Sequence, residues 1–325
     1  MISRRDWIGF TAGAGVALAL NRRILFAQGN IITRAIPSTG EKLPVVGLGT
    51  ANTFSATARG PEADSLREVL KVMLEAGGTV VDSAPGYGAS EEVSGRLAAD
   101  LGASSKIFWA TKVNVAGRGG SANRDEAIAQ IERSFQLLKK PKIDLIQVHN
   151  LGDVPTQLGI LKEFKQQGRV RYIGVTTTSD NQYGQLEQIM RNEPLDFIEV
   201  DYSLANRNVE EVILPLAIER KIGVIPALPF GRESLFRRVE GKPLPDWAKD
   251  IDAMTWSHYF LKYIIGHPAV TVAIPGTRNP AHMKDNMGAA FGRLPDEAMR
   301  KRMIEYFDSV ALPPAAGRGG RGGLS

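Results

Sequence analysis

The chain has 325 residues, a hydrophobic fraction of 43% and a formal net charge of +5 at pH 7. This length accommodates one large α/β barrel or two smaller domains, and either of these buries a sizeable core. The absence of cysteine excludes disulfides, thiolate metal sites and a thiol nucleophile. The four histidines lack the close spacing that is typical of a metal site, so no metal is expected.

The positive charge lies at the two ends of the chain. Four arginines and one aspartate give residues 1–23 a net charge of +3, and Arg318 and Arg321 add +2 in the tail. Residues 28–316 are therefore close to neutral. A neutral central region does not favour a nucleic-acid-binding surface.

Residues 1–27 are predicted to be an export signal. Arg4 and Arg5 precede Ile8–Leu20, a mildly apolar stretch that is too short to span a bilayer and so favours a secretory signal over an anchor. With Arg22 and Arg23 after this stretch, the segment resembles a twin-arginine signal, which exports folded proteins. We therefore expect export through the twin-arginine machinery to the periplasm. An amphipathic N-terminal helix is the alternative, and the cleavage site stays open.

From residue 31 onward, strand and helix patterns alternate. Thr33–Ile36 and Leu43–Val45 flank a Thr39–Glu41 turn and predict a hairpin. Eight further strands are expected at Val45–Gly49, Val80–Ala84, Lys106–Lys112, Ile143–His149, Tyr172–Val175, Phe197–Val200, Gly223–Ala227 and Val270–Ile274. Helical spacing of apolar residues predicts a helix after each strand, and Pro215 is expected to kink or delay the one near Val209–Arg220.

Eight strands, each followed by a helix, predict an α/β fold of the (β/α)₈ TIM barrel type. The hairpin precedes this barrel, and one extra helix near Asp296–Val310 follows it. A doubly wound parallel sheet is the alternative. The predicted domain organisation is an export signal at 1–27, the barrel at 28–312 and a disordered Gly/Arg-rich tail at 313–325.

The segment Val80–Glu91 contains the first candidate acid/base residues. Asp82 ends a predicted strand, and Tyr87 lies in the loop above it. A tyrosine with an ordinary pKa of about 10 is a poor proton donor at neutral pH unless a cation lowers that pKa. Lys112, at the end of the next strand, is the expected cation. A capped turn with a surface tyrosine is the alternative for this loop alone.

Several further segments, each at a strand end, accompany this loop in order. Gly47–Thr50 spans the end of the first strand and the start of its loop, Ala110–Lys112 ends the third strand, and Asp144–His149 forms most of the fourth. Together with Asp82–Glu91, these segments resemble the aldo/keto reductase family, and the resemblance extends from Arg34 to about Leu312. It implies an NAD(P)-dependent oxidoreductase that transfers hydride between a nicotinamide cofactor and a small aldehyde or ketone, or the corresponding alcohol.

The resemblance also implies the catalytic group Asp82, Tyr87, Lys112 and His149. Tyr87 would donate the proton that the reduced carbonyl oxygen needs. Lys112 would lower the pKa of Tyr87 and would be held in place by Asp82. A neutral His149 would orient the carbonyl oxygen by a hydrogen bond.

The implied cofactor is NADP, with NAD possible, bound without a Rossmann domain. In agreement with this, no Gly-x-Gly-x-x-Gly pattern follows a strand. The segment that begins at Ile274 is a strand end, a turn and a helix start, which suits a phosphate. The expected cofactor-binding residues are Thr50, Thr176, Thr177, Glu199, Phe230, Gly231, Gly276, Thr277, Arg278, His282, Asp285 and Asn286.

The chain departs from the family pattern at several of these positions. Thr176 and Thr177 stand where many members have serine and asparagine on the nicotinamide carboxamide. Glu199 replaces a glutamine, so it can accept a hydrogen bond from the amide but cannot donate one. Gly276 replaces the usual lysine of the phosphate turn, which leaves Arg278 as the nearby cation and leaves the choice between NADP and NAD open.

Two other functions remain possible at this level. A barrel of this kind could bind the cofactor without catalysis and act through a partner protein. It could also be an isomerase or lyase that uses Tyr87 and Lys112 for enolisation. The physiological substrate stays open, because the loops that would line its pocket vary freely in such folds. No stable membrane span is expected.

Overall fold

A parallel sheet forms the centre of the molecule in the computed structural model, which describes residues 29–56, 60–116 and 119–311. The predicted export signal and the Gly/Arg-rich tail lie outside these ranges. The strands follow one another in chain order: β3 (Leu48–Gly49), β4 (Val80–Asp82), β5 (Phe108–Val113), β6 (Ile143–Val148), β7 (Val170–Thr177), β8 (Phe197–Asp201) and β9 (Gly223–Ala227). Each strand pairs in parallel with the next one, as a βαβ chain requires.

The expected eighth strand, Val270–Ile274, closes the ring without forming a regular strand. It makes isolated parallel bridges on both sides, to Val224 in β9 and to Val46 before β3. Its backbone bonds include Thr271 N to Val224 O at 2.8 Å and Ala273 N to Val45 O at 2.9 Å. The ladder is interrupted beside Pro226, whose carbonyl accepts from Ile274 but which has no N–H to donate in return. The predicted (β/α)₈ barrel is therefore confirmed, with seven regular strands and one extended segment that pairs only through isolated bridges.

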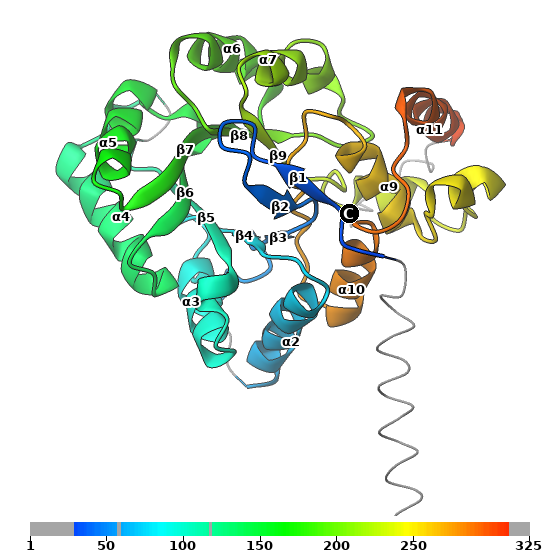
Figure 1. The fold of residues 1–325 in the computed structure, drawn as a ribbon, viewed down its shortest axis with the longest axis horizontal. Helices are drawn as coiled ribbons and strands as arrows, with labels where there is room; N and C mark the ends of the chain where they lie inside the picture. Colours follow the sequence, from blue (N-terminus) through cyan, green and yellow to red (C-terminus); the bar gives the residue numbers. More distant parts are fainter. Residues whose placement is uncertain (1–28, 57–59, 117–118, 312–325) are drawn as a thin grey trace, which may run out of the picture.

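Helices surround this ring on the outside, as Figure 1 shows. They are α2 (Pro61–Glu75), α3 (Ser90–Asp100), α4 (Arg124–Leu138), α5 (Val154–Gln166), α6 (Tyr183–Asn192), α7 (Ile213–Glu219), α8 (Ser234–Arg238), α9 (Trp256–Ile265) and α10 (Pro280–Gly288). The extra helix α11 (Glu297–Ser309) begins after Asp296, whose side chain accepts from Met299 N. The short α8 and the 3₁₀ turn Asp246–Ile251 were not expected from the sequence.

Pro215 delays α7, as predicted. A 3₁₀ turn at Asn208–Glu210 comes first, and α7 then begins at Ile213. Pro215 therefore lies in the first helical turn. The N–H groups of this turn make no hydrogen bond within the helix, so a proline is tolerated there. The helix is correspondingly shorter than the predicted Val209–Arg220.

The hairpin of β1 (Thr33–Ala35) and β2 (Lys42–Pro44) lies across one end of the ring (Figure 1). Ile36 and Leu43 from this hairpin join an inner cluster with residues at the starts of strands, such as Phe108 and Phe197. Arg34 adds bonds to His267 O at 2.6 Å and Val270 O at 2.7 Å. The hairpin thus closes the N-terminal end of the barrel and leaves the opposite end open. Within the described ranges, the structure contains no helix that is long and apolar enough to cross a membrane.

Candidate active site

The open, C-terminal end of the barrel contains a cavity of about 360 Å³. Asp82 ends β4, Thr176 and Glu199 lie near the ends of β7 and β8, and His149 directly follows β6. All four line the cavity, together with Tyr87 from the loop after β4. Because parallel strands end at the same edge of the sheet, these five residues meet here although Asp82 and Glu199 are 117 positions apart in the sequence.

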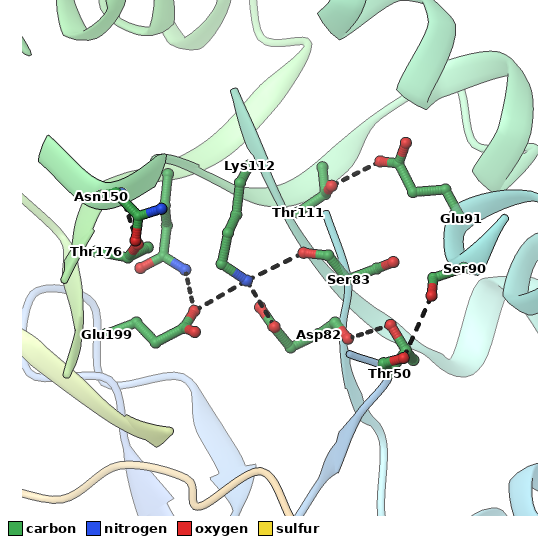
Figure 2. A network of polar contacts seen from close by, with 11 residues as sticks. Thr50, Asp82, Ser83, Ser90, Glu91, Thr111, Lys112, Asn150, Thr176 and Glu199 are labelled. Carbon is green, nitrogen blue, oxygen red and sulfur yellow. Dashed lines mark hydrogen bonds and ion pairs between the residues drawn. The ribbon is translucent and has the colours of Figure 1, made fainter. Parts of the chain in front are cut away.

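Lys112 lies between two carboxylates, as Figure 2 shows. Its Nζ is 2.6 Å from Asp82 Oδ1 and 3.1 Å from Glu199 Oε2, and it also donates to Ser83 O at 3.0 Å. The side chains of Lys112, Asp82 and Glu199 are 0%, 3% and 5% exposed. Gln147 Nε2 donates to the same Glu199 oxygen at 3.0 Å. The bond from Lys112 to Asp82 agrees with the prediction, whereas the ion pair with Glu199 was not foreseen.

Burial and charge set the protonation of this cluster. Burial alone would lower the pKa of Lys112, but Asp82 and Glu199 outweigh it and raise that pKa well above its ordinary value. Burial, then the negative charge of Glu199, raises the pKa of Asp82 to about 8 despite the opposing effect of Lys112. The lysine is therefore charged, and the carboxylates compete for its single positive charge.

Tyr87 lies above Lys112, with the Lys112 Nζ 5.1 Å from the centre of its ring. Burial raises the pKa of Tyr87 to about 12, and the charge of Lys112 only partly opposes this. Lys112 lowers the pKa of Tyr87, as predicted, but a net lowering is wrong because burial outweighs the charge of Lys112. Glu199 and Asp82 raise the pKa further.

His149 lies beside Tyr87, with ring centroids 5.7 Å apart and an edge-on angle of 83°. Burial, followed by the charge of Lys112, lowers the pKa of His149 to about 4. The imidazole is therefore neutral near pH 7, as the sequence analysis expected. Its Nδ1 is buried and has no hydrogen-bond partner in the described part of the chain.

Unusual backbone conformations mark the rim of the cavity. Four non-glycine residues that line it, Asn52, Asn150, Leu228 and Arg232, have left-handed φ angles between 52° and 58°. Such conformations are uncommon for residues with a Cβ and concentrate at functional sites. This clustering supports the assignment of the cavity as the functional site on grounds that are independent of its charged groups.

Other predicted cofactor residues divide into those inside and those outside the cavity. Glu199, Thr176 and Gly276 line it. Thr177 does not, because strand alternation turns its side chain away, and its hydroxyl bonds to Gln182 Oε1 at 2.6 Å. Thr50 is fully buried and donates to Asp82 O at 2.9 Å, so it supports the β4 end without reaching the cavity.

The loop after β9 also differs from the expectation. Neither Phe230 nor Gly231 lines the cavity, and Phe230 instead packs on Phe236 with ring centroids 4.9 Å apart. The next residue, Arg232, does line it. Arg232 is the only arginine or lysine among the described residues on the cavity wall, and the sequence analysis missed it.

The remaining predicted residues follow Gly276 along the chain, outside the cavity. Arg278 is exposed, and its guanidinium donates to Asn52 O at 3.0 Å on the cavity rim. His282 is exposed and Thr277 is buried beside the turn. Asp285 accepts from Thr255 Oγ1 at 3.0 Å and so connects α10 to α9. Asn286 is buried within α10.

A sequence model of the Aldo/keto reductase family matches residues 45–303, which is more than half of the chain. The chain belongs to the aldo/keto reductase family. The resemblance inferred from the strand-end motifs is thereby confirmed. The matched range includes the cavity, the buried lysine cluster and the turn at Gly276.

Known reductases are similar to this chain over most of its length. Aldo-keto reductase YhdN of Bacillus subtilis is 30% identical over 197 residues, which covers 58% of this chain and 59% of YhdN, less than two thirds of that protein. Probable aldo-keto reductase 1 of Glycine max is 27% identical over 291 residues, covering 77% of this chain and 80% of that protein. The crystal structure of an aldo/keto reductase from Klebsiella pneumoniae, described as a complex with NADP and acetate, has a TM-score of 0.68 at 21% identity. It covers 82% of this chain and 93% of that one, and it supports the same fold.

The residues of this cavity and of the turn beside it fit a nicotinamide dinucleotide. The cavity accommodates the reacting end, and Gln147 Oε1 is a buried acceptor with no partner in the described ranges. Gly276 presents bare backbone to the cavity, where an added Cβ would approach Gly49 O to 3.0 Å. Beyond this turn, the exposed Arg278 and the start of α10 suit a phosphate.

Two features of the sequence could have identified the missed residues. Thr178 lines the cavity two positions after Thr176, so the period of two in a strand predicts it in place of Thr177. Arg232 adjoins Gly231 in a loop that follows a strand end, which is where a barrel places functional residues. No pattern in the sequence indicates the contact between Glu199 and Lys112.

Proposed function

We propose that this aldo/keto reductase is an NADP-dependent oxidoreductase that reduces small aldehydes and ketones or oxidises the corresponding alcohols. The arrangement of Tyr87 and His149 over the buried Lys112 is the observation that supports this most directly. The assignment of NADP is supported by the Klebsiella pneumoniae reductase of the same fold, whose structure is described as a complex with NADP. The cofactor supplies or accepts the hydride.

In this proposal, Tyr87 is the proton donor and His149 orients the carbonyl oxygen. The high pKa of Tyr87 keeps its proton in place until negative charge develops on that oxygen. His149, which is neutral, donates a hydrogen bond without adding charge to the site. Lys112 stabilises the tyrosinate that forms, and Asp82 fixes the position of Lys112.

Cofactor titration followed by single-turnover measurement tests this function. NADPH and NADH are titrated against the purified protein and binding is followed by fluorescence. Bound NADPH is then mixed with a reactive aldehyde such as a nitrobenzaldehyde. Binding with oxidation is the expected result. Binding without oxidation across a broad aldehyde and ketone panel would favour the non-catalytic, cofactor-binding alternative, and absence of binding would favour an isomerase or lyase.

We also propose that the protein is exported in its folded state to the periplasm by the twin-arginine machinery. The paired Arg4 and Arg5 before a short apolar stretch support this, although they lie outside the described residues. Folded export is consistent with a reductase that must bind its cofactor before it leaves the cytoplasm.

A further inference from the structure

The charge balance around Lys112 is unusual. Asp82 Oδ1 and Glu199 Oε2 both lie within 3.1 Å of the one ammonium group, and all three side chains are at most 5% exposed. The second oxygen of Asp82, Oδ2, is buried with no hydrogen-bond partner among the described residues. One positive charge balances one carboxylate, so the second carboxylate needs either a proton or another positive charge.

Within residues 29–56, 60–116 and 119–311, the structure shows no other fixed cation in contact with the two carboxylates. On the inner face, β4 contributes Asp82, β5 contributes Lys112 and β6 contributes the neutral Gln147. Beside Glu199, β7 places Thr176 and β9 places Ile225, neither of which titrates. The other titratable or charged groups on the cavity wall are Tyr87, His149 and Arg232.

Neither Tyr87 nor His149 exchanges a proton between pH 6 and pH 9. Burial raises the pKa of Tyr87 to about 12 and lowers that of His149 to about 4. Lys112 stays charged, because its pKa is well above its ordinary value. Both carboxylates contact the same ammonium group, and burial, followed by the negative charge of Glu199, raises the pKa of Asp82 to about 8. The group in this cluster whose pKa lies in this range is therefore Asp82, which shares the ammonium of Lys112 with Glu199.

We propose that Asp82 and Glu199 share one proton beside Lys112, and that this proton leaves when an oxidised, positively charged nicotinamide occupies the cavity. The inference rests on the proposed function, because hydride transfer to a carbonyl bound by Tyr87 and His149 requires the nicotinamide in the same cavity. The reduced ring is neutral, so the pair keeps its proton when the reduced cofactor binds. Glu199 thereby makes the site sensitive to the redox state of the cofactor.

With this arrangement, the protons and charges balance when a carbonyl is reduced. The substrate carbon gains a hydride, its oxygen gains the Tyr87 proton, and the cofactor ring is left with one positive charge. Lys112 can return a proton to Tyr87 and take up the proton of the carboxyl pair. The pair then has one extra negative charge, which offsets the charge of the oxidised ring.

Proton linkage tests the proposal directly. The affinities of the wild-type protein for NADP⁺ and NADPH are measured from pH 6 to 9, and NADP⁺ binding is also followed by calorimetry in two buffers with different ionisation enthalpies. NADP⁺ should release up to one proton per site near pH 7. As the pH rises toward the pKa of Asp82, the ratio of the Kd for NADP⁺ to the Kd for NADPH should fall by up to about tenfold per pH unit. The 2′-phosphate titrates in both cofactors and cancels in this ratio.

Glu199→Gln removes the second carboxylate and keeps the size of the side chain. It should abolish the proton release and make the Kd ratio independent of pH, while weakening NADP⁺ about tenfold or more relative to NADPH at pH 9. Glu91→Gln is the matched control, because Glu91 is a buried carboxylate that accepts from Thr111 Oγ1 at 2.6 Å and does not line the cavity. This variant should retain the wild-type pH dependence.

The outcomes distinguish a failure of the shared-proton proposal from a failure of the proposed function. If both cofactors bind to the wild-type protein without proton release and with a constant Kd ratio, the shared proton is ruled out and the proposed function stands. If Glu199→Gln keeps the wild-type pH dependence, Glu199 has no such role. If neither cofactor binds, the proposed function fails and this inference fails with it.

Discussion

Tyr87 shows how one residue depends on its surroundings. Its position after β4 follows from the sequence, but its pKa is set by burial and by three charged groups from β4, β5 and β8. A phenol with a pKa of about 12 retains its proton in the resting protein. Its function as an acid then depends on the negative charge that develops on the substrate oxygen.

Replacing Tyr87 with phenylalanine removes the hydroxyl and keeps the ring. We expect folding and cofactor affinity to survive, whereas the chemical step slows by about 10²–10⁴-fold, the range for a positioned acid. The Michaelis constant should change much less, because the interaction develops in the transition state. Single-turnover oxidation of bound NADPH by a nitrobenzaldehyde measures this rate, and a near-wild-type rate would exclude Tyr87 from the mechanism.

Lys112→Met should be comparably damaging by a different route. It raises the pKa of Tyr87 further and leaves two buried carboxylates without their cation. The rate losses of the two single variants should not add in the double variant, because both act on one proton transfer. Since this substitution also threatens folding, circular dichroism of each variant is the control, and additive losses in folded protein would separate the two residues.

Arg278 is the residue that tests cofactor choice. If its exposed guanidinium binds the 2′-phosphate of NADP, Arg278→Ala should weaken NADPH by about tenfold to a hundredfold and leave NADH nearly unchanged. Fluorescence titrations measure both affinities. Arg191→Ala is a matched control, because Arg191 pairs with Glu187 on the surface of α6. Equal losses for both cofactors would exclude this assignment.

At the scale of elements, the hairpin β1–β2 closes the barrel end opposite the active site. Ile36 is fully buried in the inner cluster that the hairpin forms with the strand starts. The hairpin also places Glu41 beside Arg171 and Tyr172 of β7, which fixes it to the wall of the barrel. Its contribution is therefore to stability, while the chemistry takes place at the other end.

Ile36→Ala should lower the free energy of unfolding by about 2–5 kcal/mol, because it removes buried methyl groups and leaves a cavity. Urea denaturation followed by circular dichroism measures the change. Ile218→Ala on α7 is the control, since Ile218 is 52% exposed and its replacement should change the stability by about 0.5 kcal/mol or less. Similar losses for both variants would show that the hairpin does not contribute to the core as described.

At the scale of the whole molecule, the structure is a self-contained barrel that begins at the hairpin. Ile32 N already bonds to Ala290 O at 2.8 Å, which connects the start of the described chain to the segment after α10. Removal of residues 1–27 should therefore leave a folded protein that binds the cofactor. Thermal denaturation and an NADPH titration check this expectation.

The proposed export can also be tested at the scale of the whole molecule. Arg4→Lys combined with Arg5→Lys should retain the protein in the cytoplasm, because the paired arginines are the proposed recognition element. Cell fractionation with immunoblotting measures the distribution. Arg22→Lys with Arg23→Lys preserves the charge downstream and should leave export intact, whereas unchanged export of the first variant would exclude the twin-arginine route.

The sequence by itself determined the order of the elements and the chain position of the catalytic candidates. Strand and helix periodicities depend on neighbouring residues, so they predicted the barrel, the hairpin and the delay of α7 at Pro215. The same local logic placed Asp82, Lys112 and His149 at strand ends, where parallel strands bring them to one edge of the sheet. These properties are local or follow from topology.

Only the tertiary structure decided how these groups act on one another. The contact of Glu199 with Lys112 joins residues 87 positions apart, and it depends on the ring closing around them. The tertiary structure also shows that Val270–Ile274 closes the barrel without forming a regular strand. It shows that the Thr177 side chain points away from the cavity and that Arg232 lines it. Burial and the distances between charges are set only when the chain folds. They determine the pKa of Tyr87 and place a second carboxylate beside Lys112, so neither feature could be predicted from the sequence.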